Sequence, residues 1–275
     1  MHAPLTPLTS PGRLRLIDPA ALNGALPARR VVGFETAWAR HADEVAEAQR
    51  LRHRVFVEEL GARPRVPPGT PAGHEADLFD AHCEHLLLRP RHDDGSCGPV
   101  VGTYRVLTAA AARRTGGFCS DTAFDLTRLR PLRARMAELG RACVAPQWRA
   151  GFAVGALWGA LAEFMPGHGV ETVIGCASLG LRDGGHAAAS LWERLRAGHL
   201  APIEHHVQPR IALPVEALSH QLAVETPALL RAYLRCGARL LGPPAWDTDF
   251  QTADLPLMLR LADLQPRWRR LPAAR

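Results

Sequence analysis

Residues 138–165, ELGRACVAPQWRAGFAVGALWGALAEFM, contain two segments of different hydrophobic pattern, and these segments decide the fold. Over residues 136–144, charged and apolar residues mix along the length of a strand, which ends before Pro146. Residues 151–165 are apolar on every side for about four turns and are interrupted by Glu163. This run is shorter than the roughly 20 apolar residues that a membrane span needs. We therefore expect a strand that leads into a buried helix.

The start of the expected helix is rich in small residues, which lower helix propensity but let a backbone or a ligand come close. These residues are Gly151, Ala153, Gly155 and Ala156. A helix N-terminus carries free amide groups and about half a positive charge, and Arg149 precedes this one, so we expect an anion such as phosphate to bind there. The alternative is that the small residues serve close packing of the helix on a sheet.

The composition is that of a globular protein with a basic surface. The chain has 275 residues and a formal net charge of +6, with 22% charged residues and scattered arginines. This charge suits an acidic protein partner, an anionic membrane surface or a nucleic acid, and the sequence has no motif that supports nucleic acid. We expect membrane contact to be peripheral to the inner membrane, since no segment is long and apolar enough to cross it.

The cysteines indicate neither a metal site nor a disulfide framework. The chain has 6 cysteines, which are isolated and form no C-x-x-C pair. We therefore expect no metal and a reducing, cytoplasmic location. The N-terminus also lacks the continuous apolar core of a signal peptide.

The chain divides into a proline-rich segment, residues 1–28, which we expect to be flexible, and one domain with a C-terminal extension, residues 29–275. Within that domain, strand and helix patterns alternate, which indicates an α/β sheet layer. The expected strands are residues 31–39, 84–88, 100–107, 136–144, 170–178, 201–216 and 238–242. The expected helices are residues 43–60, 151–165, 187–197 and 227–236, and residues 109–117 are expected to be a connection.

Four short motifs occur in order between residues 52 and 141. Arg52 and Phe56 are separated by three residues, residues 75–80 read E-x-D-x-F-D, residues 102–105 read G-x-x-R, and residues 138–141 read E-x-x-R. Together they resemble the pattern of acyl-homoserine lactone synthases, which belong to the GNAT acyltransferase superfamily. Two later segments, residues 141–161 and 229–261, resemble the bacterial L-ornithine N-alpha-acyltransferases.

This resemblance implies a GNAT-like α/β acyltransferase fold, with a mixed central sheet flanked by helices and with C-terminal additions. It also implies transfer of a 3-hydroxy fatty acyl group from acyl carrier protein to the alpha-amine of L-ornithine, which gives lyso-ornithine lipid. Two alternatives stay open: an acyl-homoserine lactone synthase, and a non-catalytic GNAT-like module that binds carrier protein or lipid. Ala62 stands where the lactone synthases often have tryptophan, which weighs against the first alternative.

The sequence at the start of the expected helix departs from the usual coenzyme A-binding motif, and this bears on the acyl donor. GNAT enzymes that use coenzyme A usually carry R/Q-x-x-G-x-G/A there, whereas Phe152 and Val154 occupy the two small-residue positions after Arg149. The departure favours the phosphopantetheine arm of a carrier protein, which has one phosphodiester, over coenzyme A. We expect Arg149 and Gly151 to bind this arm, with no permanently bound cofactor.

The chemistry requires a base, because a free alpha-amine has a pKa near 8 and is mostly protonated in the cytoplasm. Glu138 is the candidate base and Arg141 its catalytic partner. Burial would raise the pKa of Glu138, and Arg141 would lower it. The alternative is that both residues belong to a structural ion network with Arg52, Asp77 and Asp80.

The resemblance also implies a set of substrate-binding residues, namely Arg52, Phe56, Asp77, Asp80 and Arg105. Phe56 has a helix-core alternative, and Arg105 has a structural pairing with the acids as its alternative. The acidic group of residues 75–84 would favour a dibasic amino acid, although we expect Glu75 and Glu84 to be solvated.

Neither the histidines nor the cysteines add a further mechanism. His82 and His85 lack a second ligand cluster and indicate no metal. Cys143 has no recognisable histidine partner, so direct attack of the amine is favoured over an acyl-enzyme.

Overall fold

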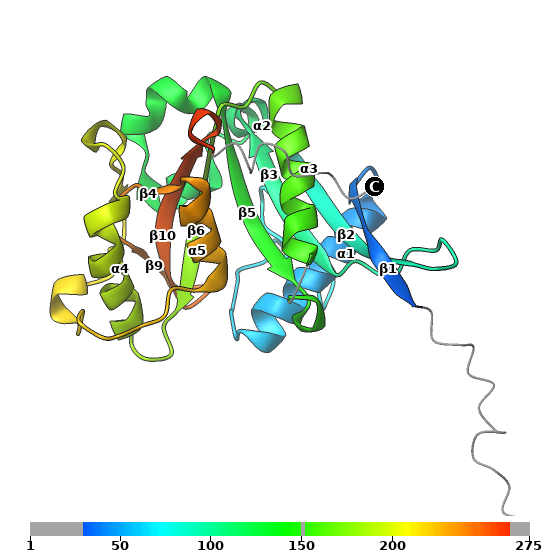
Figure 1. Ribbon diagram of the computed structural model, residues 1–275, viewed down its shortest axis with the longest axis horizontal. Helices are drawn as coiled ribbons and strands as arrows, with labels where there is room; N and C mark the ends of the chain where they lie inside the picture. The colour runs from blue at the N-terminus through cyan, green and yellow to red at the C-terminus, as the bar shows by residue number, and fades with distance from the viewer. Residues whose placement is uncertain (1–29, 150–151, 265–275) are drawn as a thin grey trace, which may run out of the picture.

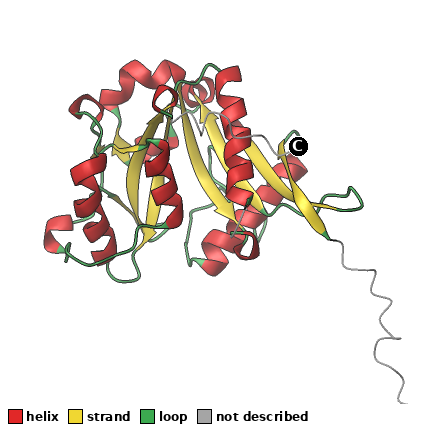
Figure 2. Ribbon diagram, viewed as in Figure 1, coloured by secondary structure: helices red, strands yellow, loops and turns green. Residues whose placement is uncertain are grey.

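The computed structural model describes residues 30–149 and 152–264 of the chain. The expected flexible segment 1–28 and Gly151 lie outside these residues. Figures 1 and 2 show helices on both sides of a central sheet. The expected α/β layer is therefore present.

The central sheet has 8 strands in the order β1-β2-β3-β5-β6-β10-β8, with β9 paired to β10. The pairs are antiparallel except for β5 and β6, which are parallel, so the sheet is mixed. The short strands β4 and β7 pair with each other outside it. The strands are β1 (Val31–Trp38), β2 (Glu84–His92), β3 (Gly102–Thr108), β4 (Phe124–Asp125), β5 (Met136–Val144), β6 (Thr172–Gly180), β7 (Gln208–Pro209), β8 (Arg239–Leu240), β9 (Ala245–Asp247) and β10 (Thr252–Arg260).

The helices cover the two faces of this sheet. Helix α1 contacts β3 and β5, and it continues into a π-helical segment, His53–Glu59. In Figure 1, α3 crosses in front of β3 and β5, and α5 lies in front of β6 and β10. The α-helices are α1 (Ala42–Arg52), α2 (Ala109–Arg114), α3 (Ala153–Gly167), α4 (His186–His199) and α5 (Ala228–Cys236). Short 3₁₀ helices span Asp80–His82, Cys119–Thr122, Thr127–Arg135, Pro146–Trp148, Ile203–His205, Val215–Ala217 and Leu261–Asp263.

Most of the expected elements are confirmed, and two expectations are wrong. Residues 109–117 contain α2, because the alanine-rich run favours a helix and the Thr108 hydroxyl accepts a hydrogen bond from the Ala111 amide at its start. Residues 201–216 hold the two-residue strand β7 between 3₁₀ turns, since proline recurs there and prevents a longer strand.

Helix α3 is confirmed as a core element. Its side chains at Leu157, Leu161 and Phe164 are buried, and the helix contacts β1, β2 and β3. Ala153 and Ala156 are buried as well, as close packing on the sheet requires. Gly155 is exposed, and a Cβ atom there would meet nothing within 4 Å, so packing does not explain this glycine.

Strands β5 and β6 separate soon after they meet. Their pairing covers Met136–Glu138 and Thr172–Ile174, although both strands continue. Beyond Glu138, β5 bulges away from a regular ladder, because Arg141 and Ala142 together face Tyr104 of β3. Arg141 has a φ of 50°, which residues other than glycine rarely adopt. The sheet is therefore open between β5 and β6, next to Glu138.

Gly175 lies where the two strands separate, and we expect its replacement by alanine to destabilise the protein. A Cβ atom there would lie 2.5 Å from the backbone oxygen of Leu139, which has no flexible side chain to move aside. Gly175→Ala should lower the free energy of unfolding by about 1–3 kcal/mol in chemical denaturation. Gly180→Ala on the same strand is the control, because a Cβ atom there meets nothing within 4 Å. Equal stability of the two variants would contradict the close contact.

Candidate active site

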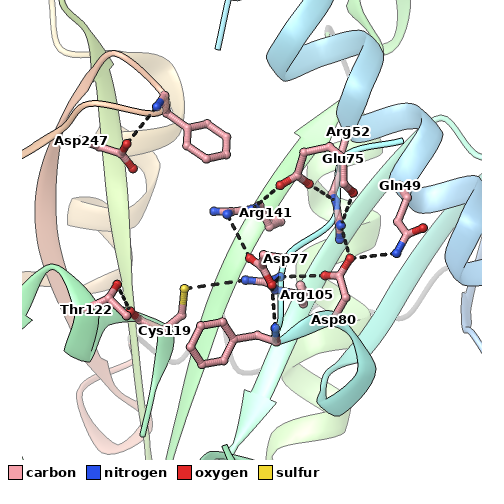
Figure 3. Close-up of polar contacts among 12 residues, drawn as sticks. Gln49, Arg52, Glu75, Asp77, Asp80, Arg105, Cys119, Thr122, Arg141 and Asp247 are labelled. Atoms are coloured by element: carbon pink, nitrogen blue, oxygen red, sulfur yellow. Dashed lines mark hydrogen bonds and ion pairs between the residues drawn. The ribbon is translucent and has the colours of Figure 1, made fainter. Parts of the chain in front are cut away.

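A network of buried ion pairs links α1, the loop before β2, and β3 (Figure 3). Arg52 is fully buried, and its guanidinium pairs with Glu75 at 2.6 Å and with Asp80 at 2.5 Å. Arg105 Nη1 lies 2.6 Å from Asp77 and 2.7 Å from Asp80. Gln49 also donates a hydrogen bond to Asp80 at 2.9 Å. The structure therefore places the candidate binding residues of three separate motifs in one cluster.

Arg141 extends this network from β5. Its Nε donates to Glu75 at 3.0 Å and its Nη2 to Asp77 at 3.0 Å. The centre of its guanidinium lies 4.5 Å from the ring centroid of Phe250, a cation–π contact. Its Nη1 makes no hydrogen bond or ion pair to any residue that the structure describes. Arg141 therefore keeps its Nη1 group for a ligand.

The arginines keep the acids of the network ionised. Burial raises the pKa of Asp80, but Arg52 and Arg105 outweigh it and hold this pKa far below its usual range. Burial likewise raises the pKa of Asp77, and Arg105 and Arg141 lower it further than burial raises it. Both side chains are therefore carboxylates at neutral pH, with charges that the arginines balance.

Glu138 stands apart from this network, so the ion-network alternative holds for Arg141 and not for Glu138. Glu138 is 7% exposed, and its carboxylate accepts hydrogen bonds from the Ser120 amide at 3.0 Å and from the Ser120 hydroxyl at 2.6 Å. Among residues 30–149 and 152–264, it has no ion pair. Burial raises the pKa of Glu138, and the bonds from Ser120 oppose this only in part. The pKa is thus shifted toward neutral pH, as a base requires.

Glu138 faces a cavity of about 310 Å³. One wall is formed by the arginine network and the other by β6, β10 and the loop before β10. The second wall carries two further acids, Asp247 and Asp254. The cavity is also lined by two serines, Ser120 and Ser178. The four short motifs gave no signal for these residues, because Ser178, Asp247 and Asp254 lie far beyond residue 141 and Ser120 lies between the third and the fourth motif.

A second cavity of about 700 Å³ borders the first, and both are lined by Leu139, Gly140, Arg141, Cys176, Ser178, Asp247, Phe250 and Asp254. It reaches the face of the sheet that carries Tyr104, whereas the first cavity reaches the face that carries its neighbour Arg105. The hydroxyls of Tyr104 and Tyr233 are hydrogen-bonded to each other at its wall. Its apolar lining is formed by Phe56, Leu60, Ala62, Ala142, Ala177, Leu179, Leu181, Leu229 and Leu230.

Two other candidate residues, Phe56 and Arg149, lie outside the first cavity. Phe56 is half-buried, lines the second cavity and packs edge-on against Phe250 at 5.8 Å between ring centroids. Arg149 makes a bidentate ion pair with Glu59, at 2.5 and 2.7 Å, so a phosphodiester would have to compete with that carboxylate. Its phosphopantetheine role stays a prediction.

One of the two acids that we expected to be solvated is instead buried. Glu75 is 0% exposed, because the arginines of α1 and β5 converge on it from outside its own sequence neighbourhood. Glu84 is exposed, as expected. His85 is buried and bonds to the Asp80 carbonyl at 3.0 Å, and no group of metal-ligating side chains is found in the part of the chain that the structure describes.

The cysteines near the site are poor nucleophiles. Burial raises the pKa of Cys143 to about 12, and burial together with the charge of Glu138 does the same for Cys119. A thiol with such a pKa is protonated at neutral pH and does not attack a thioester efficiently. The arrangement therefore favours direct attack by an amine. Over the described residues, the structure also contains no helix long and apolar enough to span a bilayer.

A family model described as an acetyltransferase (GNAT) domain matches residues 51–159, which include Glu138, Arg141 and most of the ion network. Two solved structures align with most of the chain. The acyl-homoserine lactone synthase LasI matches with a TM-score of 0.47 and 16% identity, covering 85% of this chain and 91% of LasI. FeeM, an N-acyl amino acid synthase from uncultured soil microbes, matches with a TM-score of 0.48 and 12% identity, covering 89% and 95%. The chain is a GNAT-type N-acyltransferase, and the expected fold class is confirmed.

Curated relatives define the family more closely. The L-ornithine N(alpha)-acyltransferase of Rhodobacter capsulatus is 36% identical over 247 residues, which cover 83% of this chain and 90% of the relative. The enzymes of the same name from Rhizobium meliloti and Brucella abortus are each 32% identical, covering 87% and 90% of this chain and 84% and 92% of the relatives. The chain belongs to the L-ornithine N(alpha)-acyltransferase family. This family membership confirms the resemblance and the prediction of an enzyme, and it does not support a non-catalytic module.

Proposed function

We propose that this enzyme transfers a 3-hydroxy fatty acyl group from acyl carrier protein to the alpha-amine of L-ornithine. The observation that carries the proposal is a buried Glu138, without an ion pair among the described residues, in a small polar cavity beside the opening between β5 and β6. A larger, more apolar cavity shares part of its lining. A small polar cavity suits an amino acid, and a large apolar cavity suits an acyl chain. The names of the relatives supply the acceptor, ornithine.

On the acceptor side, Glu138 accepts a proton from the alpha-ammonium or from the attacking amine. The raised pKa of Glu138 is closer to the pKa of the alpha-amine than that of an ordinary glutamate. Proton transfer to Glu138 therefore costs less free energy. The Nη1 group of Arg141 is available for the carboxylate of the amino acid. The ion network fixes Arg141 in place for this contact.

On the donor side, the acyl chain occupies the second cavity, and the thioester lies beside Leu139, Gly140 and Arg141, where the cavities share walls. The neutral amine attacks the carbonyl carbon, a C–N bond forms, and the C–S bond breaks. Glu138 takes the proton from nitrogen, and the carrier leaves as a thiolate. The proton then passes from Glu138 through water to the thiolate, which gives the free thiol and restores the base. Arg149 and Gly151 contact the phosphodiester of the carrier's arm in this proposal.

The donor and the product also bear on location. A carrier-protein donor places the reaction in the cytoplasm, and an acylated amino acid is an amphiphile that partitions into membranes. We propose that the net charge of +6 favours contact with the anionic surface of the inner membrane. Sedimentation with vesicles of anionic and of neutral lipid tests this contact, and equal binding to both would contradict it.

The test of the function is an assay with purified enzyme, 3-hydroxyacyl carrier protein and L-ornithine. We expect free carrier thiol to appear in step with acyl-ornithine, both followed by mass spectrometry. The same acyl group on coenzyme A should react more slowly, and S-adenosylmethionine should not replace ornithine. No turnover with any carrier-linked chain would contradict the proposal, and preferred use of S-adenosylmethionine would instead support a lactone synthase.

A further inference from the structure

Two carboxylates on the wall opposite the arginine network lack a cation. Asp254 is on β10, and Asp247 ends β9 beside it, since Asp247 pairs with Thr252 in the ladder. Asp254 accepts a hydrogen bond from the Thr252 hydroxyl at 2.9 Å, and Asp247 accepts bonds from the amides of Asp249 and Phe250 at 2.9 and 2.8 Å. Within the described ranges, neither carboxylate has an ion pair.

The arginine side of the site differs from these two acids. Glu75, Asp77 and Asp80 each form an ion pair with arginine, whereas Asp254 has the like charge of Asp247 beside it and feels Arg141 only at longer range, without an ion pair. Burial raises the pKa of Asp254, and the nearby Asp247 raises it further, against the lowering effect of the hydrogen bonds to Ser178 and Thr252. Because the two carboxylates repel each other, a cation that binds beside both would relieve this repulsion. Both side chains lie where the first cavity meets the second, and the first cavity is also lined by Glu138, which is buried and has no ion pair within the described residues.

Strand β6 lies between the strand of Glu138, β5, and the strand of Asp254, β10. Glu138 faces Ile174 across the β5–β6 pairing, and Asp254 faces Ser178 across the β6–β10 pairing, further along β6. The cavity thus has one carboxylate at the expected position of the amine that reacts, and a pair of carboxylates across β6. A ligand with two ammonium groups on one short chain complements carboxylates at two separate places in one cavity.

We propose that Asp254, assisted by Asp247, binds the side-chain ammonium of the acceptor and selects a diamino acid over amino acids with uncharged side chains. This inference rests on the proposed function for the position of the alpha-amine at Glu138. It differs from the expectation that the acids of residues 75–84 select a dibasic substrate, because arginines already neutralise the buried members of that group and Glu84 is exposed.

The probe pair for this subsite is L-ornithine and L-norvaline, which has the same carbon chain without the terminal amine. Calorimetry without acyl donor should show ornithine binding at least about 100-fold more tightly than norvaline to the unaltered enzyme, since norvaline leaves the acids unpaired. Asp254→Asn should reduce this ratio below about tenfold, because it weakens the binding of ornithine and leaves that of norvaline unchanged. Asp247→Asn should reduce the ratio to a smaller extent. Glu84→Gln, which also removes one negative charge, should leave the ratio unchanged.

Thermal unfolding in the same samples shows whether the variants fold. Asp254→Asn removes one of two neighbouring like charges, so without ligand it should melt at the same temperature or higher, and it should lose the stabilisation that ornithine gives. An ornithine preference that survives in folded Asp254→Asn and Asp247→Asn would overturn the proposal. Loss of the preference in Glu84→Gln would overturn it as well. Because these measurements need no acyl donor, they stand apart from the turnover assay, whose failure would instead count against the proposed function.

Discussion

Replacing Glu138 by glutamine is expected to lower kcat by about 10²- to 10⁴-fold, the usual contribution of a positioned base. Glutamine has nearly the same shape and can still accept the bonds from the Ser120 amide and hydroxyl, so the site should keep its form. Burial already penalises the charged form of Glu138, so the neutral side chain should not lower stability at neutral pH. The measurement is single-turnover acyl transfer, with thermal unfolding of the same preparation.

The pH dependence separates catalysis from structure. In the unaltered enzyme, kcat should rise with pH as Glu138 loses its proton, at a pKa above that of an ordinary glutamate. The Glu138→Gln variant should lose this acid limb. Glu163→Gln changes an exposed acid on α3 and should keep both the limb and the rate. If Glu138→Gln lost stability and activity together, the residue would be structural and Glu138 would not be the base.

The strand and helix that decide the fold were predictable because their signals are local. Residues 136–144 form β5 as predicted, and α3 begins close to the predicted start. The mixed pattern before Pro146 and the apolar run after it depend on neighbouring residues alone. The predicted strand at residues 201–216 failed because a few β-formers among prolines are too weak a signal for a strand.

The spacing of Glu138 and Arg141 illustrates what a local pattern cannot show. Residues three apart on a regular strand point to opposite faces, so the E-x-x-R spacing alone does not bring these side chains together. The bulge at Arg141, with its positive φ, changes the alternation, and both residues line the first cavity. We predicted that Arg141 would lower the pKa of Glu138. In the structure, Arg141 instead forms ion pairs with Glu75 and Asp77.

Burial of the acids was equally outside the reach of the sequence. Glu75 resembles other acids in a loop, yet it is fully buried because Arg52 and Arg141 meet it from distant segments. Asp254 belongs to the site through the register of β10 against β6, which no short motif records. Motifs therefore identified the arginine side of the cavity, while the opposite side required the pairing of the C-terminal strands.

Replacing Arg52 by methionine is expected to lower the free energy of unfolding by about 3–5 kcal/mol, the usual cost of removing one partner of a buried ion pair. Methionine fills much of the space but leaves Glu75 and Asp80 with one arginine each, Arg141 and Arg105. The buried carboxylates would then lack part of the charge that offsets their desolvation. Chemical denaturation at neutral pH measures the loss.

The control is Arg89→Met, because Arg89 forms a bidentate pair with Glu47 at 2.7 and 2.8 Å near the surface. Its side chain is 20% exposed and that of Glu47 is 31% exposed, so water screens the pair and its loss should cost about 1 kcal/mol or less. The loss in free energy of unfolding caused by Arg52→Met should also become smaller as the pH is lowered. The folded pKa of Asp80 is lowered, so its stabilisation is present above the unfolded pKa near 3.9 and is lost as pH falls below it. Equal costs for the two arginines, or a deficit that grew in acid, would contradict the assignment of Arg52 as the central cation of the network.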